Sequence, residues 1–95
     1  MYIVSLKYVK PLNEVERYLE EHVKFLDKHY QAKNFVFSGR KVPRTGGVIL
    51  VNVQSKDVLE TILNEDPFYM NQIAEYEITQ VEITKCDELF RSFLT

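Results

Sequence analysis

The sequence predicts an α+β fold built around one antiparallel sheet, and three observations support that prediction. Apolar and polar residues alternate from Tyr2 to Val9, which is the period of a β-strand. A long amphipathic stretch follows Pro11 and has the period of an α-helix. Two further apolar runs, Phe35–Ser38 and Gly47–Val53, flank a loop of Gly, Pro, Arg and Lys, which indicates two strands joined by a turn.

The composition is that of a small globular protein, and we expect residues 1–95 to form a single domain. The net charge of −2 argues against a general nucleic-acid binder, because neutralising phosphates requires a basic surface. No stretch approaches the roughly 20 apolar residues that span a bilayer. Cys86 is the one cysteine, and the first residues lack the pattern of a signal peptide. We therefore expect a cytoplasmic protein that binds neither nucleic acid nor membranes.

The first helix is expected to run from about Glu14 to about Ala32, with Asn13 as its N-cap and Glu16 in a capping-box-like position. One side of this helix carries an apolar stripe, which consists of Leu12, Val15, Leu19, Val23, Leu26 and Tyr30. One flank of the stripe, where a side chain can line a cavity between helix and sheet, carries Tyr18, His22, Phe25 and His29. Of these, we expect His29 at the solvated end of the helix.

The second half of the chain predicts a short helix capped by Ser55 and a last strand over Ala74–Thr84. Asp66 precedes Pro67 and is therefore held at a break rather than inside a helix. The apolar phase of the last strand slips partway along, which predicts a bulge or bend near Thr79-Gln80. The C-terminal segment, residues 86–95, has apolar residues at helical spacing, and we expect a short helix that docks onto another surface because it is too short to be stable alone.

The order of these elements is that of the ferredoxin-like βαββαβ fold, with a four-stranded antiparallel sheet and two helices on one face. The other face of the sheet stays uncovered in such a subunit. Its apolar candidates include Ile3, Val9, Ile49, Val51 and Val53. Soluble monomers rarely expose an apolar patch of this size, so we expect a homodimer that forms through the sheet.

Several short motifs, in their order and spacing, resemble the YciI-like family of small α+β proteins. They are His22 followed by Phe25-Leu26, Ser38-Gly39, Gly46-Gly47, Asp66-Pro67-Phe68 and Tyr76-Glu77-Ile78. The resemblance extends from Tyr2 to about Ile83. It implies a dimeric α+β barrel with a cleft beside the sheet and a site centred on a His–Asp pair, which maps onto His22 and Asp66.

Two interpretations of this pair are open. If the two side chains meet, the carboxylate orients the imidazole and the free ring nitrogen can take a proton near neutral pH. Alternatively, His22 is a boundary histidine bonded to a backbone carbonyl, and Asp66 only caps the turn before Pro67. The residues alone favour the second interpretation, because a His and an Asp occur in most proteins and their presence does not indicate a pair. The resemblance favours a catalytic pair.

The predicted substrate-binding residues surround the basic loop. Arg40 and Arg44 carry forked donors suited to a carboxylate or phosphate, although cations on such a loop are often simply solvated. Ser38, next to Gly39, is predicted as a hydrogen-bond donor of the pocket. Candidates for its apolar wall are Phe25, Phe37, Phe68 and Tyr76, although aromatic residues at these spacings more often belong to the core. Where the YciI-like family commonly has a proline after the Ser-Gly pair, this chain has Arg40.

These residues predict a proton-transfer enzyme more readily than a metalloenzyme. His22 and His29 are one heptad apart and no third ligand is apparent, so we expect no metal and no cofactor. The predicted function is a lyase-like or isomerase-like reaction on a small, anionic cyclic compound, with His22 and Asp66 as the acid–base pair. A dimer that binds a metabolite without converting it, and a structural dimer that docks partners through its C-terminal segment, remain as alternatives.

Overall fold

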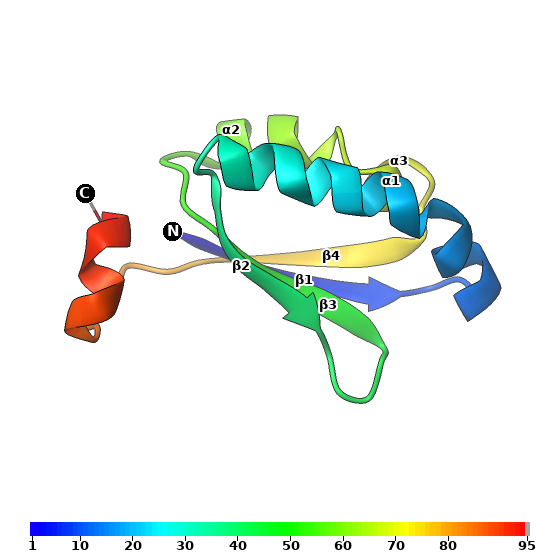
Figure 1. Ribbon diagram of the computed structural model, residues 1–95, viewed down its shortest axis with the longest axis horizontal. Helices are drawn as coiled ribbons and strands as arrows, with labels where there is room; N and C mark the ends of the chain where they lie inside the picture. The colour runs from blue at the N-terminus through cyan, green and yellow to red at the C-terminus, as the bar shows by residue number, and fades with distance from the viewer. Residues whose placement is uncertain (95) are drawn as a thin grey trace.

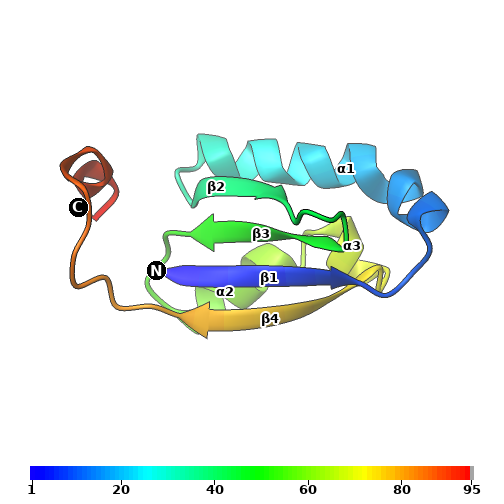
Figure 2. The same cartoon turned by 90° about the horizontal axis from the view of Figure 1, so that it is seen from below.

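The computed structural model describes residues 1–94 and confirms the predicted α+β fold (Figure 1). Its elements are β1 (Tyr2–Tyr8), α1 (Leu12–Gln31), β2 (Phe35–Arg40), β3 (Gly46–Val51), α2 (Lys56–Leu63), α3 (Pro67–Met70), β4 (Ala74–Gln80) and the 3₁₀ helix η1 (Glu88–Leu94). Within this range, four strands form one antiparallel sheet in the order β2-β3-β1-β4 (Figure 2). The three α-helices lie on one face of that sheet, and α3 is an extra turn that the sequence did not predict.

The core lies between the sheet and the helices. The alternation in β1 directs Tyr2, Val4 and Leu6 toward the helices, and all three are buried. The register places Ile49 of β3 opposite Val4, so this residue shares the buried face. The expectation that Ile49, Val51 and Val53 belong to the uncovered face is therefore wrong, because all three belong to the core under the helices.

The uncovered face carries a smaller apolar cluster that pairing across the strands brings together. Ile3 of β1 and Phe37 of β2 both lie opposite Leu50 of β3. Ile3 is 38% exposed and Phe37 is 52% exposed, while Leu50 is buried between the neighbouring strands. We call these three residues the open-face cluster.

Helix α1 begins two residues earlier than predicted, and the side that it buries is shifted from the predicted stripe toward the predicted flank. Pro11 is the N-cap, and its carbonyl accepts the backbone N–H groups of Glu14 and Val15, so the predicted Asn13 side-chain cap is wrong. The buried residues of α1 are Val15, His22, Phe25 and His29, whereas Val23 of the predicted apolar stripe is 43% exposed. Three residues of the predicted flank thus belong to the buried face. Of the predicted stripe, Val15 is buried, and Leu19, Leu26 and Tyr30 are partly buried against the core.

The chain leaves the sheet at the end of β4. The strand ends at Gln80, and Val81 N–H donates to the Met1 carbonyl at 2.9 Å before the chain departs. The slip in apolar phase therefore marks the end of the strand, and the predicted bulge and the strand end at Thr84 are wrong. Beyond it, η1 lies past the end of the sheet, where Asn52 Nδ2 donates to the Phe93 carbonyl at 2.7 Å (Figures 1 and 2). Among the described residues, no helix has the length and hydrophobicity to cross a bilayer.

Candidate functional site

Local sequence fixes the position of Asp66. Helix α2 ends at Leu63, and Pro67 starts α3 because its ring preorganises the first helical position. Asp66 is the N-cap of α3, and its Oδ1 accepts the Phe68 backbone N–H at 2.9 Å. The side chain is completely buried. Its position at the break before Pro67, outside a helix, agrees with the prediction.

His22 reaches this carboxylate from the middle of α1. Its Nδ1 lies 2.8 Å from Asp66 Oδ1, and the imidazole stacks on the Phe68 ring with centroids 4.0 Å apart and planes tilted by 8°. His22 is 8% exposed. The structure therefore brings together the two residues that the sequence proposed as a pair, together with the phenylalanine that follows Asp66-Pro67.

The hydrogen bonds define the tautomer of His22. An ionised carboxylate only accepts hydrogen bonds, so His22 Nδ1 carries the proton and donates it to Asp66. The other ring nitrogen, Nε2, has no partner within residues 1–94. A neutral imidazole in this state presents a basic lone pair on Nε2, which is the arrangement that a general base needs.

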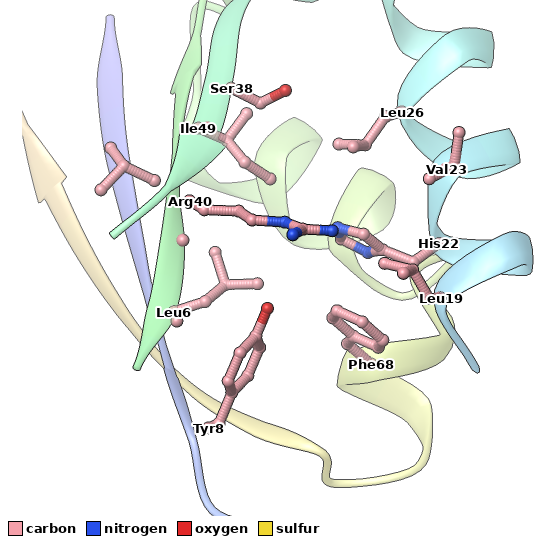
Figure 3. A pocket seen from close by; sticks show the side chains of 14 residues that line it. Leu6, Tyr8, Leu19, His22, Val23, Leu26, Ser38, Arg40, Ile49 and Phe68 are labelled. Carbon is pink, nitrogen blue, oxygen red and sulfur yellow. The ribbon is translucent and has the colours of Figure 1, made fainter. Parts of the chain in front are cut away.

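His22 lines a cavity between α1 and the sheet with a volume of about 150 Å³. A cavity of that size in a protein core accommodates a benzene molecule. Its apolar wall is formed by Leu6, Leu19, Val23, Leu26, Ile49 and Phe68. The polar side chains of the lining are His22, Tyr8, Ser38 and Arg40 (Figure 3). The cavity therefore suits one ring with a few polar substituents.

Arg40 supplies the positive charge of the cavity. It pairs with Gly47, which itself pairs with Leu6, so its side chain leaves β2 on the helix-covered face. In Figure 3 this side chain extends across the cavity toward the wall that carries His22. Arg40 is exposed and forms no ion pair within residues 1–94. Its forked donors are thus available to an anionic group.

The other residues predicted around the basic loop have defined places. Ser38 Oγ lies 2.7 Å from the Tyr30 hydroxyl, and both Ser38 and Gly39 line the cavity. Arg44 is not part of the lining, because its Nη1 donates to Glu16 Oε1 at 2.7 Å. A substrate-binding role for Arg44 stays a prediction.

The two glycines that begin β3 allow the neighbouring strands to pack closely. A Cβ at Gly46 would lie 1.7 Å from the Leu6 carbonyl oxygen, and one at Gly47 would lie 2.8 Å from the Gly39 carbonyl oxygen. Either contact is closer than a side chain allows, so both glycines permit the strands of the cavity floor to approach one another.

Two tyrosines of the site have roles that the sequence did not predict. The Tyr8 hydroxyl points into the cavity (Figure 3). The Tyr76 hydroxyl donates to Asp66 Oδ2, and burial, reinforced by the Asp66 charge, raises the pKa of this phenol. From the sequence, Tyr76 was a candidate wall of the cavity together with Phe25 and Phe37, but all three lie outside the lining. The sequence did contain one indication for Tyr8: it alternates with Leu6 along β1 and therefore lies on the same face of the sheet.

His29 is buried rather than solvated, which corrects the expectation from its place near the helix end. It is 4% exposed and lies against the rings of Phe25 and Phe35. Asn34 Nδ2 donates to its Nδ1 at 3.0 Å, so its Nε2–H donates to Glu65 Oε1 at 3.1 Å. Over residues 1–94, no group of three or more His, Cys, Asp or Glu side chains is arranged to hold a metal ion.

Comparisons with known proteins support the family and the fold of this chain. A family model described as the YCII-related domain matches residues 1–82. The fold is similar to the solved structure of 5-chloro-2-hydroxyhydroquinone dehydrochlorinase (TftG) from Burkholderia phenoliruptrix AC1100, in complex with 2,5-dihydroxybenzoquinone. The TM-score is 0.71 at 14% sequence identity, and the match covers 86% of this chain and 94% of that chain. No curated protein sequence matches.

Proposed function

The chain belongs to the YCII-related domain family, and we propose that it is an enzyme that moves a proton on a small, anionic cyclic compound. The reaction would be that of a lyase or an isomerase, with His22 as general base and acid and Asp66 as the residue that orients it. The observation that carries the proposal is the Nε2 of a carboxylate-bound histidine, which has no partner among residues 1–94 and lies at the wall of a ring-sized cavity.

The proposed reaction balances within the site. His22 Nε2 accepts a proton from a hydroxyl on the ring, which leaves the electron pair on that oxygen, or from a C–H next to a ring carbonyl, which moves the electron pair onto the carbonyl oxygen as an enolate. Asp66 stabilises the imidazolium that forms, and Arg40 stabilises the oxyanion across the cavity. Collapse of the oxyanion then either expels a leaving group as an anion, which is elimination, or returns the proton from His22 to another ring atom, which is isomerisation.

Size and charge select the substrate class. The cavity of about 150 Å³ admits one six-membered ring, and Arg40 favours a phenolate, enolate or carboxylate. The structurally similar dehydrochlorinase acts on a chlorinated hydroxyhydroquinone and was solved with a dihydroxybenzoquinone, both single-ring compounds of this kind. That likeness supports a hydroxylated ring as the substrate of this chain.

The test uses a probe panel of single-ring anions: 2,5-dihydroxybenzoquinone, chlorinated hydroquinones and hydroxybenzoates. Binding is followed by changes in the His22 ring NMR signals, and conversion by absorbance and released chloride. We expect at least one compound to bind at His22 and to be converted. A compound recovered unchanged would favour a metabolite-binding dimer, and a panel without any effect on His22 would refute the proposed site.

We also propose that two copies of the chain pair through the open-face cluster, with residues 86–95 adding to the contact. The exposed Ile3 and Phe37 support this, because a partner sheet would remove their apolar area from water. Phe37→Glu should give a monomer in light scattering, and removal of residues 86–95 should weaken the dimer. Val42→Glu is the control, since Val42 is 96% exposed on the β2–β3 loop and should leave assembly unchanged. A monomeric wild-type chain would contradict the pairing.

A further inference from the structure

The carboxylate of Asp66 accepts hydrogen bonds on both of its oxygens. Oδ1 accepts the Phe68 backbone N–H at 2.9 Å and the His22 Nδ1–H at 2.8 Å. Oδ2 accepts the hydroxyl of Tyr76, which comes from β4. The His–Asp pair is therefore a chain of three side chains from three elements, and its last member has no contact with the cavity.

We infer that Tyr76 is a positioning residue, which holds Asp66 so that His22 keeps its proton on Nδ1 and its lone pair on Nε2. The meaning of this tautomer for catalysis rests on the proposed function, but the tautomer itself can be measured without any substrate. Tyr76 touches neither His22 nor the cavity in this arrangement and acts through Asp66 alone.

The bond from Tyr76 exceeds what the helix cap requires. Capping α3 uses only Oδ1 and the Phe68 N–H, as an asparagine at the same position would do. Oδ2 lies in a side chain with no exposed surface, where a carboxylate oxygen without a donor is costly. Tyr76 satisfies that oxygen and leaves Oδ1 to His22.

The environment of Tyr76 keeps it in the donor role. Its ring packs edge-on against Tyr69 with centroids 5.1 Å apart and planes at 88°, which fixes the direction of the hydroxyl. Burial raises the pKa of the phenol, and the Asp66 charge raises it further, so the hydroxyl stays protonated at neutral pH and donates. The Tyr76 hydroxyl therefore remains the donor to Asp66 and does not give up its proton to the carboxylate.

Loss of the Tyr76 hydroxyl leaves Asp66 two ways to satisfy Oδ2. The carboxyl group can rotate toward another donor, or it can take up a proton. Rotation lengthens the bond from His22, and protonation removes the charge that holds the Nδ1 proton in place. In both cases the Nε2–H tautomer of His22 becomes populated, and in that state Nε2 cannot accept a proton from a substrate.

The experiment compares Tyr76→Phe with Tyr69→Phe, which removes a hydroxyl from the neighbouring ring. Long-range ¹⁵N–¹H NMR spectra, recorded over a pH series up to the plateau of the imidazole signals, distinguish the protonated ring nitrogen from the one with the lone pair. We expect one tautomer, Nδ1–H, in the wild type and in Tyr69→Phe, and a mixture in Tyr76→Phe. On any compound of the probe panel that is converted, Tyr76→Phe should lose roughly tenfold in turnover with little change in KM.

The outcomes separate this inference from the proposed function. A pure Nδ1–H tautomer in Tyr76→Phe overturns the inference. A mixed tautomer in a protein that converts no compound of the panel supports the inference and counts against the enzyme. If Tyr76→Phe does not fold, the wild type decides: its Tyr76 hydroxyl proton should exchange slowly and show a nuclear Overhauser effect to the His22 Nδ1 proton. Absence of that proton signal would overturn the inference.

Discussion

Helix α1 carries two buried histidines one heptad apart, and they pair with two consecutive acids in different ways. His29 uses both ring nitrogens, one toward Asn34 and one toward Glu65, and it lies against phenylalanine rings. His22 uses only Nδ1, toward Asp66, and its other nitrogen has no partner within residues 1–94. Both ring nitrogens of His29 therefore have hydrogen-bond partners, whereas Nε2 of His22 keeps its lone pair available beside a cavity.

The difference shows that spacing and burial do not identify a chemical histidine. Both residues are less than a tenth exposed, and both have a carboxylate within hydrogen-bond distance. What separates them is the second nitrogen and the space beyond it. A saturated imidazole contributes to stability, while an imidazole with a free nitrogen at a cavity can exchange a proton with a ligand.

Replacing each histidine in turn with alanine tests this comparison. The change in turnover is the largest effect that we expect. His22→Ala should reduce turnover of any converted compound of the probe panel by roughly 1,000-fold, within the range of general acid–base catalysis. His29→Ala should leave turnover within about threefold of the wild type, because it does not touch the cavity. Steady-state kinetics on folded variants, checked by circular dichroism, measures both. Equal losses in the two variants would remove the distinction.

The same two variants should rank differently in stability. His29→Ala removes two hydrogen bonds and the contacts with Phe25 and Phe35, and we expect a loss of about 2–3 kcal/mol in the free energy of unfolding. His22→Ala removes one hydrogen bond and the stacking on Phe68, and we expect a smaller loss of about 1–2 kcal/mol. Urea titration measures both values. A larger loss in His22→Ala would contradict the assignment of His29 as the structural member.

Much of the fold was predictable because its signals are local. The alternation of Tyr2, Val4 and Leu6 fixes which face of β1 is buried, and Pro67 fixes the break at which Asp66 becomes a helix N-cap. The His22–Asp66 pair followed from the resemblance and not from the residues alone. Sequence order carries no distance between residues 44 positions apart.

The failures concern features that depend on contacts between elements. Val23 looked apolar enough for the core, yet the sheet contacts the histidine-bearing side of α1 and leaves Val23 at the cavity edge. His29 looked solvated because its partners Asn34 and Glu65 come from other segments. The Tyr76 hydroxyl was unpredictable for the same reason, since its acceptor is fixed only when β4 meets α3.

The cavity distinguishes His22 from His29. Removing the positive charge that Arg40 brings to this cavity should weaken ligand binding without altering either histidine. Arg40→Met keeps the length of the side chain and removes the guanidinium, and we expect about tenfold weaker binding of panel anions. Arg44→Met is the matched control, because Arg44 pairs with Glu16 outside the lining. Isothermal titration at two salt concentrations measures the affinities. Equal weakening in both variants would assign the anion to the whole basic loop.

The two acids should differ at low pH, and this is the smallest expected effect. The hydrogen bond from Lys28 Nζ at 2.6 Å, together with that from His29, lowers the pKa of Glu65 below its ordinary value of 4.5. A folded-state pKa below the unfolded value adds stability above pH 4.5, and that stability is lost as the pH falls through the folded-state pKa. Because the Glu65 side chain is 38% exposed, solvent screening limits the contribution to about 0.5 kcal/mol.

Urea titration of Glu65→Gln between about pH 6 and pH 3 measures that contribution, since the variant lacks the titrating group. The wild type should lose about 0.5 kcal/mol more over this range than Glu65→Gln. Glu60→Gln on α2 is the control and should follow the wild type. Turnover of Glu65→Gln should stay unchanged, because its histidine does not reach the cavity. A fall in turnover would mean that the two histidine–carboxylate pairs act together, since Glu65 and Asp66 adjoin in the chain.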